Sequence, residues 1–136
     1  MRVPPALWFA PAVALMAGIF LLSSGPVPGA AEPALAVPGL DKLLHIAEYF
    51  VLGVLLLLGI HRGAPALPHS RMLAVAVGVV YAISDEVHQA LVPGRRGDFL
   101  DLAADATGVL LGVLLVAALL RRPARIEEAG ADGGED

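Results

Sequence analysis

Residues 84–101 read SDEVHQALVPGRRGDFLD and place four carboxylates, a histidine and two arginines between two strongly apolar segments. The preceding run, 72–83, has no charged residue. Its 12 residues make a helix of only about 18 Å, too short for a hydrocarbon core of about 30 Å. A membrane-crossing helix must therefore extend into the charged stretch. We predict neighbouring antiparallel spans at 72–91 and 99–120, joined by the tight turn VPGRRG at 92–97.

The composition also indicates a membrane protein. Of the 136 residues, 57% are hydrophobic and 16% are charged, and the mean hydropathy of +0.77 lies outside the ordinary range of soluble domains. Two further apolar runs, at 6–22 and 43–60, approach the roughly 20 residues that a span requires. We predict an all-α polytopic membrane protein, a compact bundle of about four transmembrane helices with short loops over residues 1–122. The Gly- and acid-rich residues 123–136 predict a disordered cytoplasmic tail.

The first apolar run has a second interpretation. Arg2, the run and then Gly29-Ala30-Ala31 have the outline of a cleaved signal peptide. The run is longer than the roughly 7–15 residues usual for such a peptide, which favours a retained span. Two other classes lack support: no basic stripe with interleaved aromatics indicates nucleic-acid binding, and without cysteine there are no disulfides or thiolate metal sites.

The distribution of basic residues predicts the orientation, because short loops rich in Lys and Arg stay in the cytoplasm. With the N-terminus inside, six basic residues face the cytoplasm and three face outward. We therefore predict that both termini are cytoplasmic. The inner set is Arg2, Arg62, Arg71, Arg121, Arg122 and Arg125, and the outer set is Lys42, Arg95 and Arg96.

Three of the expected helices have a polar stripe at the predicted outer end. An ionised carboxylate at the bilayer centre costs about 2.5–3.5 kcal/mol, so such stripes should face protein or a wet cavity. We predict an outward-facing polar pocket. The stripes have helical spacing and consist of Asp41, His45 and Glu48, of Asp85, His88 and Gln89, and of Asp98, Asp101 and Asp105.

Structural roles compete with this interpretation. Asp41 and Asp98 each stand where a helix opens and can act as N-caps. Interhelical ion pairs and hydrogen bonds within the polar set, worth about 0.6 kcal/mol each, are the alternative for the deeper groups. Close packing is expected along one side of the last helix, which also carries Asp105 and has small residues at Ala104, Gly108 and Gly112.

Three segments together resemble the VanZ-like family of small bacterial membrane proteins: DKLLHIAEYFVLG (41–53), SDEVHQALVPGRRGDFLDLAADATG (84–108) and VLLG (109–112). The resemblance implies a place in the bacterial cytoplasmic membrane and an association with resistance to teicoplanin, a glycopeptide that acts on peptidoglycan precursors at the outer face. Position 105 is Asp where many relatives have Asn. The positions that carry the family pattern are Asp41, Lys42, His45, Asp85, Glu86, Gln89, Arg95, Asp101, Asp105, Thr107, Gly108 and Gly112.

Three functions remain open. The first is an enzyme acting on an envelope lipid or wall precursor, because carboxylates with a histidine can exchange protons or hold Mg²⁺, although no recognised metal-binding spacing is present. The second is a module that binds such a lipid or the antibiotic, and the third is a structural membrane subunit whose polar cluster holds the helices together. Membrane lipids are expected partners in each case. The candidate catalytic residues are Glu86 as base with Asp85, His45, Asp101 and Asp105; the candidate ligand-binding residues are Lys42 and Arg95, gripping phosphate, with Gln89, Asp41 and Glu48.

Overall fold

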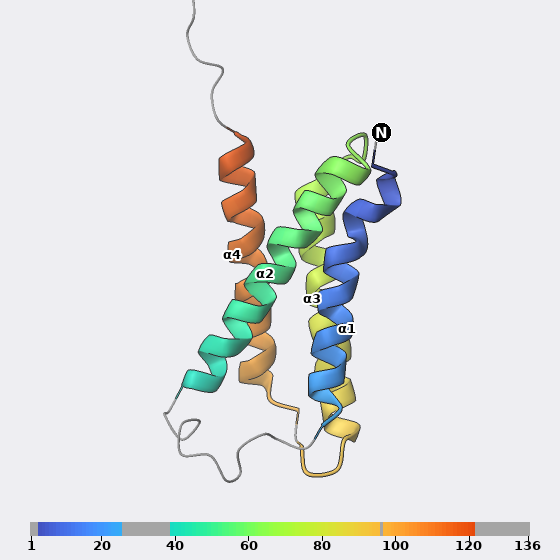
Figure 1. Cartoon of the computed structure of the whole chain (residues 1–136). Coiled ribbons are helices and arrows are strands. Elements are labelled where there is room, and N and C mark those ends of the chain that lie inside the picture. The colour runs from blue at the N-terminus through green and yellow to red at the C-terminus, as the bar shows by residue number, and fades with distance from the viewer. Residues whose placement is uncertain (1–2, 26–38, 96, 122–136) are drawn as a thin grey trace, which may run out of the picture.

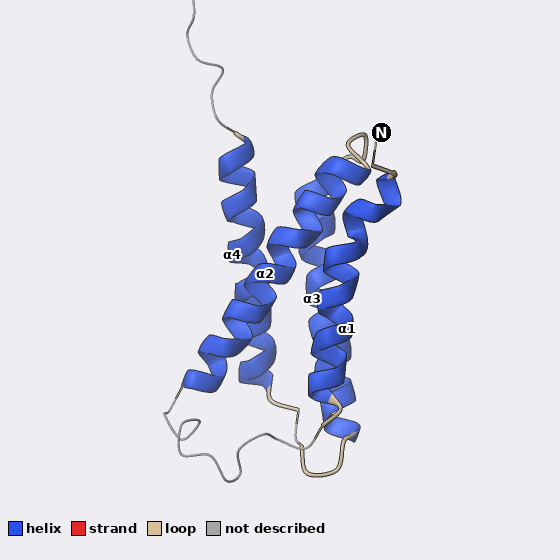
Figure 2. Ribbon diagram, in the orientation of Figure 1, coloured by secondary structure: helices blue, strands red, loops and turns tan. Residues whose placement is uncertain are grey.

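A computed structural model describes residues 3–25, 39–95 and 97–121, and in these ranges the chain is helical with no strand (Figures 1 and 2). The expected all-α bundle is confirmed. The predicted tail at 123–136 and the cleavage site at 29–31 lie outside the described residues. The elements are a 3₁₀ helix η1 (Pro5–Phe9) and the α-helices α1 (Ala10–Ser23), α2 (Leu40–Gly63), α3 (Ser70–Leu91) and α4 (Phe99–Leu120).

Three of the helical segments are long and apolar enough to cross a membrane. They are Pro5–Ser23, formed by η1 and α1, then α2 and α4. The 22-residue α3 has the length of a span, but its last two turns contain Asp85 and Glu86. Both side chains are buried inside the protein, at 3% and 8% exposure, which removes them from lipid.

The helix boundaries follow from local sequence. Pro11 lies in the first turn of α1, where its missing N–H costs no hydrogen bond. Gly39 adopts a positive φ of 82° directly before α2, so this helix begins at Leu40, earlier than expected. Asp41 is therefore inside the first turn, and its interpretation as an N-cap is wrong. Asp98 does cap α4, because its side chain accepts a hydrogen bond of 2.8 Å from the backbone N–H of Leu100.

Successive helices run in opposite directions, and α2 crosses the bundle diagonally (Figure 1). The half of α2 near its N-terminus lies beside α4, and the other half lies beside η1 and α1. The interface between α2 and α4 is the most extensive in the described structure. One end of the bundle therefore contains the starts of α2 and α4 together with the ends of α1 and α3; we call it the polar end.

Glycines allow the helices to approach closely. At Gly108 and Gly112 an added Cβ would overlap the backbone of α2, and at Gly53 it would overlap the backbone of α4. Gly78 of α3 makes room for Val109, whose Cγ1 would lie 2.6 Å from an added Cβ. The centre of the bundle is thus held by contact between small residues and backbone, the usual packing device of membrane helices.

The outer faces of the helices are apolar. On α4 alone, Leu110, Leu111, Leu114 and Leu115 are each more than 40% exposed. A helix that is apolar on all sides is stable only where its outer face meets other protein or lipid. This distribution agrees with a bundle surrounded by lipid.

Candidate functional site

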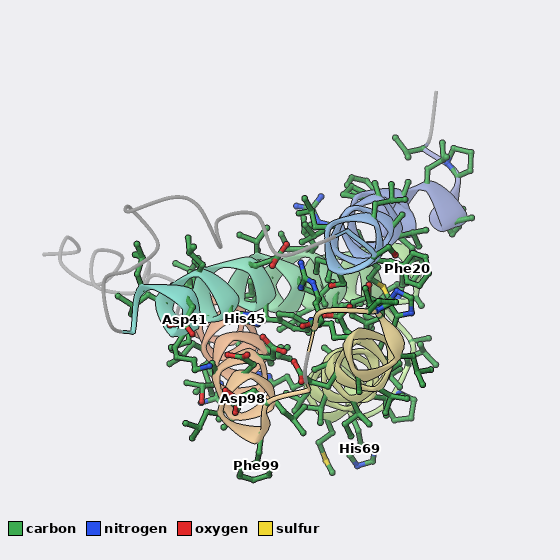
Figure 3. All side chains as sticks on the ribbon, turned by 90° about the horizontal axis from the view of Figure 1, so that it is seen from below. Phe20, Asp41, His45, His69, Asp98 and Phe99 are labelled. Atoms are coloured by element: carbon green, nitrogen blue, oxygen red, sulfur yellow. The ribbon has the colours of Figure 1, made fainter. Side chains whose placement is uncertain are left out.

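All acidic side chains in the described ranges belong to the polar end. Viewed from that end, Asp41 and His45 of α2 lie beside Asp98 at the start of α4 (Figure 3). The structure thereby brings together the stripes of three helices, because α2 and α4 begin at the end where α3 finishes. The seven acidic residues are Asp41, Glu48, Asp85, Glu86, Asp98, Asp101 and Asp105.

Lys42 joins α2 to α4 at the rim of the polar end. Its Nζ lies 2.9 Å from Oδ2 of Asp98 and 3.2 Å from Oδ2 of Asp41, and it also contacts Oδ1 of Asp101. The hydrogen bond from Lys42 holds the pKa of Asp98 below its usual value. The ammonium group is thus surrounded by carboxylates, whereas the sequence predicted that it would grip phosphate; that role stays a prediction.

His45 and Asp105 form a second link between the same helices, deeper in the bundle. Nδ1 of His45 lies 2.8 Å from Oδ1 of Asp105, whose side chain is fully buried. Nε2 of the same ring lies 4.0 Å from Oδ1 of Asp101. A carboxylate bound to one ring nitrogen orients the imidazole and leaves the other ring nitrogen to exchange a proton, so the pair has the parts of a proton acceptor.

Arg95 is directed towards the end of α1. Its Nε and Nη2 donate hydrogen bonds of 3.0 Å to the backbone oxygens of Gly25 and Leu22, and Nη1 donates one of 3.3 Å to Oε1 of Gln89. The amide nitrogen of Gln89 donates a 2.8 Å hydrogen bond to Asp85. The guanidinium group therefore binds backbone oxygens at the end of α1, in addition to the hydrogen bond that the Leu22 oxygen accepts from the N–H of Gly25. Its predicted phosphate contact stays a prediction.

Several deeper polar atoms have no hydrogen-bond partner in the described part of the chain. Glu86 accepts a 2.8 Å hydrogen bond at Oε2 from the backbone N–H of Asp98, yet its Oε1 is unpaired. The other unpaired buried atoms are Oδ1 of Asp85, Oδ2 of Asp105 and the hydroxyl of Tyr49. Buried polar groups nearly always have partners. The three carboxylate oxygens therefore lack donors within the described protein, while the hydroxyl of Tyr49 can both donate and accept.

Tyr49 was not among the candidate site residues that the sequence indicated. The structure buries it completely, within electrostatic range of Glu48, Asp85 and Asp105. The signal was available in the sequence, because Tyr49 follows His45 by four residues and therefore shares its helix face.

The sequence also gave no role to the end of α1. Ser23 accepts a 3.4 Å hydrogen bond from Gln89, and Ser24 lies 3.0 Å from Nε2 of His88. The ring of Phe20 stacks on His88 with centroids 4.4 Å apart. No spacing in the sequence connects these residues, because the contacts join helices more than 60 positions apart.

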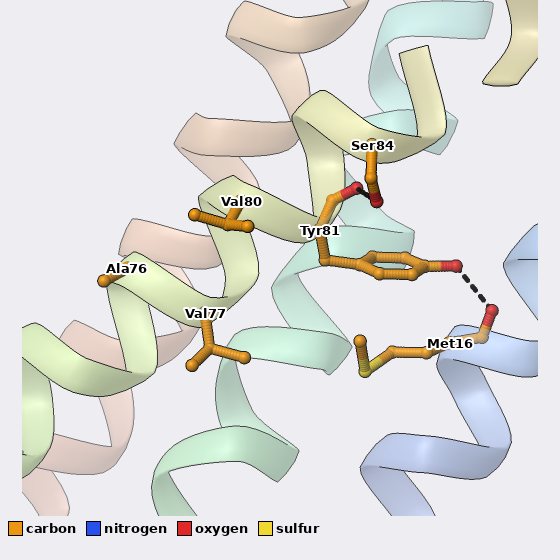
Figure 4. A pocket seen from close by; sticks show the side chains of 6 residues that line it. All are labelled: Met16, Ala76, Val77, Val80, Tyr81 and Ser84. Atoms are coloured by element: carbon orange, nitrogen blue, oxygen red, sulfur yellow. Dashed lines mark hydrogen bonds between the residues drawn. The ribbon is translucent and has the colours of Figure 1, made fainter. Parts of the chain in front are cut away.

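The described residues form no metal centre at the polar cluster, and two apolar hollows lie elsewhere in the bundle. In residues 3–25, 39–95 and 97–121, no three His, Asp or Glu side chains are grouped so that they could hold a metal ion. One hollow of about 350 Å³ lies between α1 and α3, where the hydroxyl of Tyr81 donates a 2.5 Å hydrogen bond to the backbone oxygen of Met16 (Figure 4). A second, of about 450 Å³, lies between α3 and α4. Both are almost entirely apolar.

Apolar outer faces around an internal cluster of carboxylates and one histidine define a small helical membrane protein whose buried charges gather at one end. The family model described as VanZ/LLP1 matches residues 8–121, and the chain belongs to this family. The match includes α1, which the resemblance in segments 41–53 and 84–112 left out. No curated protein and no solved structure matches the chain.

Proposed function

We propose that the polar end binds the head group of an envelope lipid or peptidoglycan precursor at the outer surface of the bacterial cytoplasmic membrane. Binding there would contribute to tolerance of glycopeptides such as teicoplanin. The observation that carries the proposal is the set of buried carboxylates, Asp85, Glu86 and Asp105, each with one oxygen that has no partner in the described structure.

The chemistry of these oxygens defines what they bind. In its ionised form a carboxyl group accepts hydrogen bonds and donates none, so a ligand of the ionised groups has to present N–H or O–H donors. The cation nearest the rim, Lys42, is already shared among carboxylates. Hydroxyl and amide groups of a glycosylated or peptide-bearing head group supply such donors. A bare phosphate supplies none when fully ionised, so it fits this interior less well.

The polar end would also be a catalytic site if His45 or Glu86 exchanged a proton with the bound head group. The 2.8 Å contact between His45 and Asp105 fixes the orientation of the imidazole. With Nε2 exposed to a bound head group, the ring could accept a proton from a hydroxyl or a water. Glu86 is the second candidate base, because its Oε1 is unpaired among the described residues.

A structural role is the competing function, and one observation favours it. Lys42 and His45 each bind a carboxylate on α4, so the polar end also fastens α2 to α4. Such bonds stabilise a bundle whether or not a ligand binds. A test must therefore separate loss of binding from loss of folded protein.

The test is teicoplanin susceptibility of a sensitive Gram-positive host producing the wild type, Glu86→Gln or a control at equal membrane abundance. Glu86→Gln keeps the shape and removes the charge, and His61→Gln is a matched control on the exposed opposite end of α2. We expect protection from wild type and from His61→Gln and none from Glu86→Gln, with equal melting temperatures in detergent.

Each other result contradicts part of the proposal. Absence of protection by the wild type removes the link to resistance. Equal protection by Glu86→Gln removes the carboxylate from the site. Loss of protection together with a lower melting temperature assigns Glu86 to helix packing.

A further inference from the structure

The open hollow between α3 and α4 has a charged residue, Arg71, at one end and apolar side chains along the rest of its length; we call it the α3–α4 groove. It extends along α3 from Arg71 to Val79 and is closed on the other side by residues of α4 that include Leu110 and Leu114. Eight residues of helix correspond to about 12 Å of length. We propose that this groove binds one acyl chain of an anionic glycerophospholipid whose phosphate pairs with Arg71.

The α3–α4 groove has the volume and the apolar lining that an acyl chain requires. At about 450 Å³ the groove is within the usual range of ligand pockets, roughly 300–1,000 Å³. In a bilayer such a groove faces hydrocarbon, because Leu110 and Leu114 on its wall are 46% and 53% exposed. An empty groove would forfeit dispersion contacts along its whole length, so an acyl chain lying in it is favoured.

Arg71 supplies the charge that selects the head group. Arg71 lies in the first turn of α3 and is exposed, and it has no ion pair or side-chain hydrogen bond within the described structure. Every described acidic residue lies at the polar end, whereas Arg62, Arg71 and Arg121 lie at the opposite end. A guanidinium group at a helix end, without a carboxylate nearby, attracts lipid phosphate.

The neighbouring hollow provides an internal comparison. It shares Ala76 with the α3–α4 groove and is lined by Val77 and Val80, but it contains no charged side chain (Figure 4). Lipid can fill that hollow as well, although nothing in it selects a head group. Selection for an anionic lipid is therefore expected only on the side of Arg71, and it does not depend on the function of the polar end.

The experiment measures binding of phosphatidylglycerol and phosphatidylcholine, with identical acyl chains, to the purified full chain in detergent. Native mass spectrometry gives the affinities, and melting temperatures without lipid show that each variant is folded. We expect a preference for phosphatidylglycerol that Arg71→Gln lowers about fivefold, the ratio equivalent to about 1 kcal/mol for one basic residue near a membrane surface. Arg121→Gln, at the same end, should keep the preference.

Two substitutions test whether the lipid chain lies in the α3–α4 groove. Val79→Phe fills the α3–α4 groove and should weaken binding of both lipids, while Val80→Phe fills the neighbouring hollow and should not. Equal losses in Arg71→Gln and Arg121→Gln would show general surface charge and overturn the proposal. So would unchanged lipid binding in Val79→Phe, or competition by glycerol phosphate as strong as that by the intact lipid.

Discussion

Replacing Gly108 with alanine tests how the contact between α2 and α4 is made. The added Cβ would lie 2.9 Å from the backbone nitrogen of Phe50 and closer still to the backbone oxygen of Ile46. Ordinary contacts of a Cβ begin at 3.4 Å, so the nitrogen alone requires a displacement of about 0.5 Å. Both obstacles are backbone atoms of a helix, and no side chain can rotate away to make room.

The expected change in the free energy of unfolding of Gly108→Ala combines two opposing effects. Overpacking of this kind destabilises a fold by about 1–3 kcal/mol, whereas replacing a helical glycine by alanine stabilises it by about 0.5–1 kcal/mol. Since the obstacle is rigid, we expect Gly108→Ala to lower the free energy of unfolding by roughly 2 kcal/mol. The control is Gly18→Ala in α1, where no atom lies within 4 Å of the added Cβ and stability should rise by about 0.5–1 kcal/mol.

The assay is reversible unfolding of both variants by dodecyl sulfate in mixed micelles, followed by helical circular dichroism. A Gly108→Ala protein as stable as the wild type would refute the reasoning, because α2 and α4 would then not touch through their backbones.

Three further predictions concern polar contacts. Because Lys42 holds the pKa of Asp98 low, the pair stabilises the fold above the usual aspartate pKa and loses this effect as the pH falls through the lowered value; carboxyl NMR titration of Lys42→Met should show the Asp98 pKa rising. Arg95→Gln should speed hydrogen exchange at the end of α1, because the two hydrogen bonds from Arg95 to backbone oxygens there are lost. Exchange as slow as in wild type would contradict this. Tyr81→Phe should lower the free energy of unfolding by about 0.5–1.5 kcal/mol, measured by the same dodecyl sulfate titration, and no change would show that its bond to Met16 is replaced by another.

Some of the candidate site was visible in the sequence because helical periodicity is a local property. The spacing of Asp41, His45 and Glu48 predicted that they share one helix face, and the same spacing includes Tyr49. The N-cap role of Asp98 is equally local and is confirmed, whereas that of Asp41 is wrong because Gly39, two residues earlier, occupies the N-cap position.

Pairings across the bundle could not be obtained in this way. The spacing of charges along a chain does not determine which of Asp98, Asp101 or Asp105 meets Lys42 and which meets His45. That depends on the diagonal crossing of α2 over α4, which the glycines permit but do not specify. The direction of Arg95 towards the carbonyls of α1 likewise depends on where α1 packs, and no motif in the turn indicates it.

By itself, the sequence determined that this protein is a bundle of apolar helices with the acidic residues of those helices at one end, because hydrophobicity and helical period act within each segment. Only the tertiary structure decided which charges are paired and which buried oxygens are left without a described partner. The reason is physical: burial and hydrogen bonding arise from contacts between helices, and their geometry is set by packing across the whole bundle.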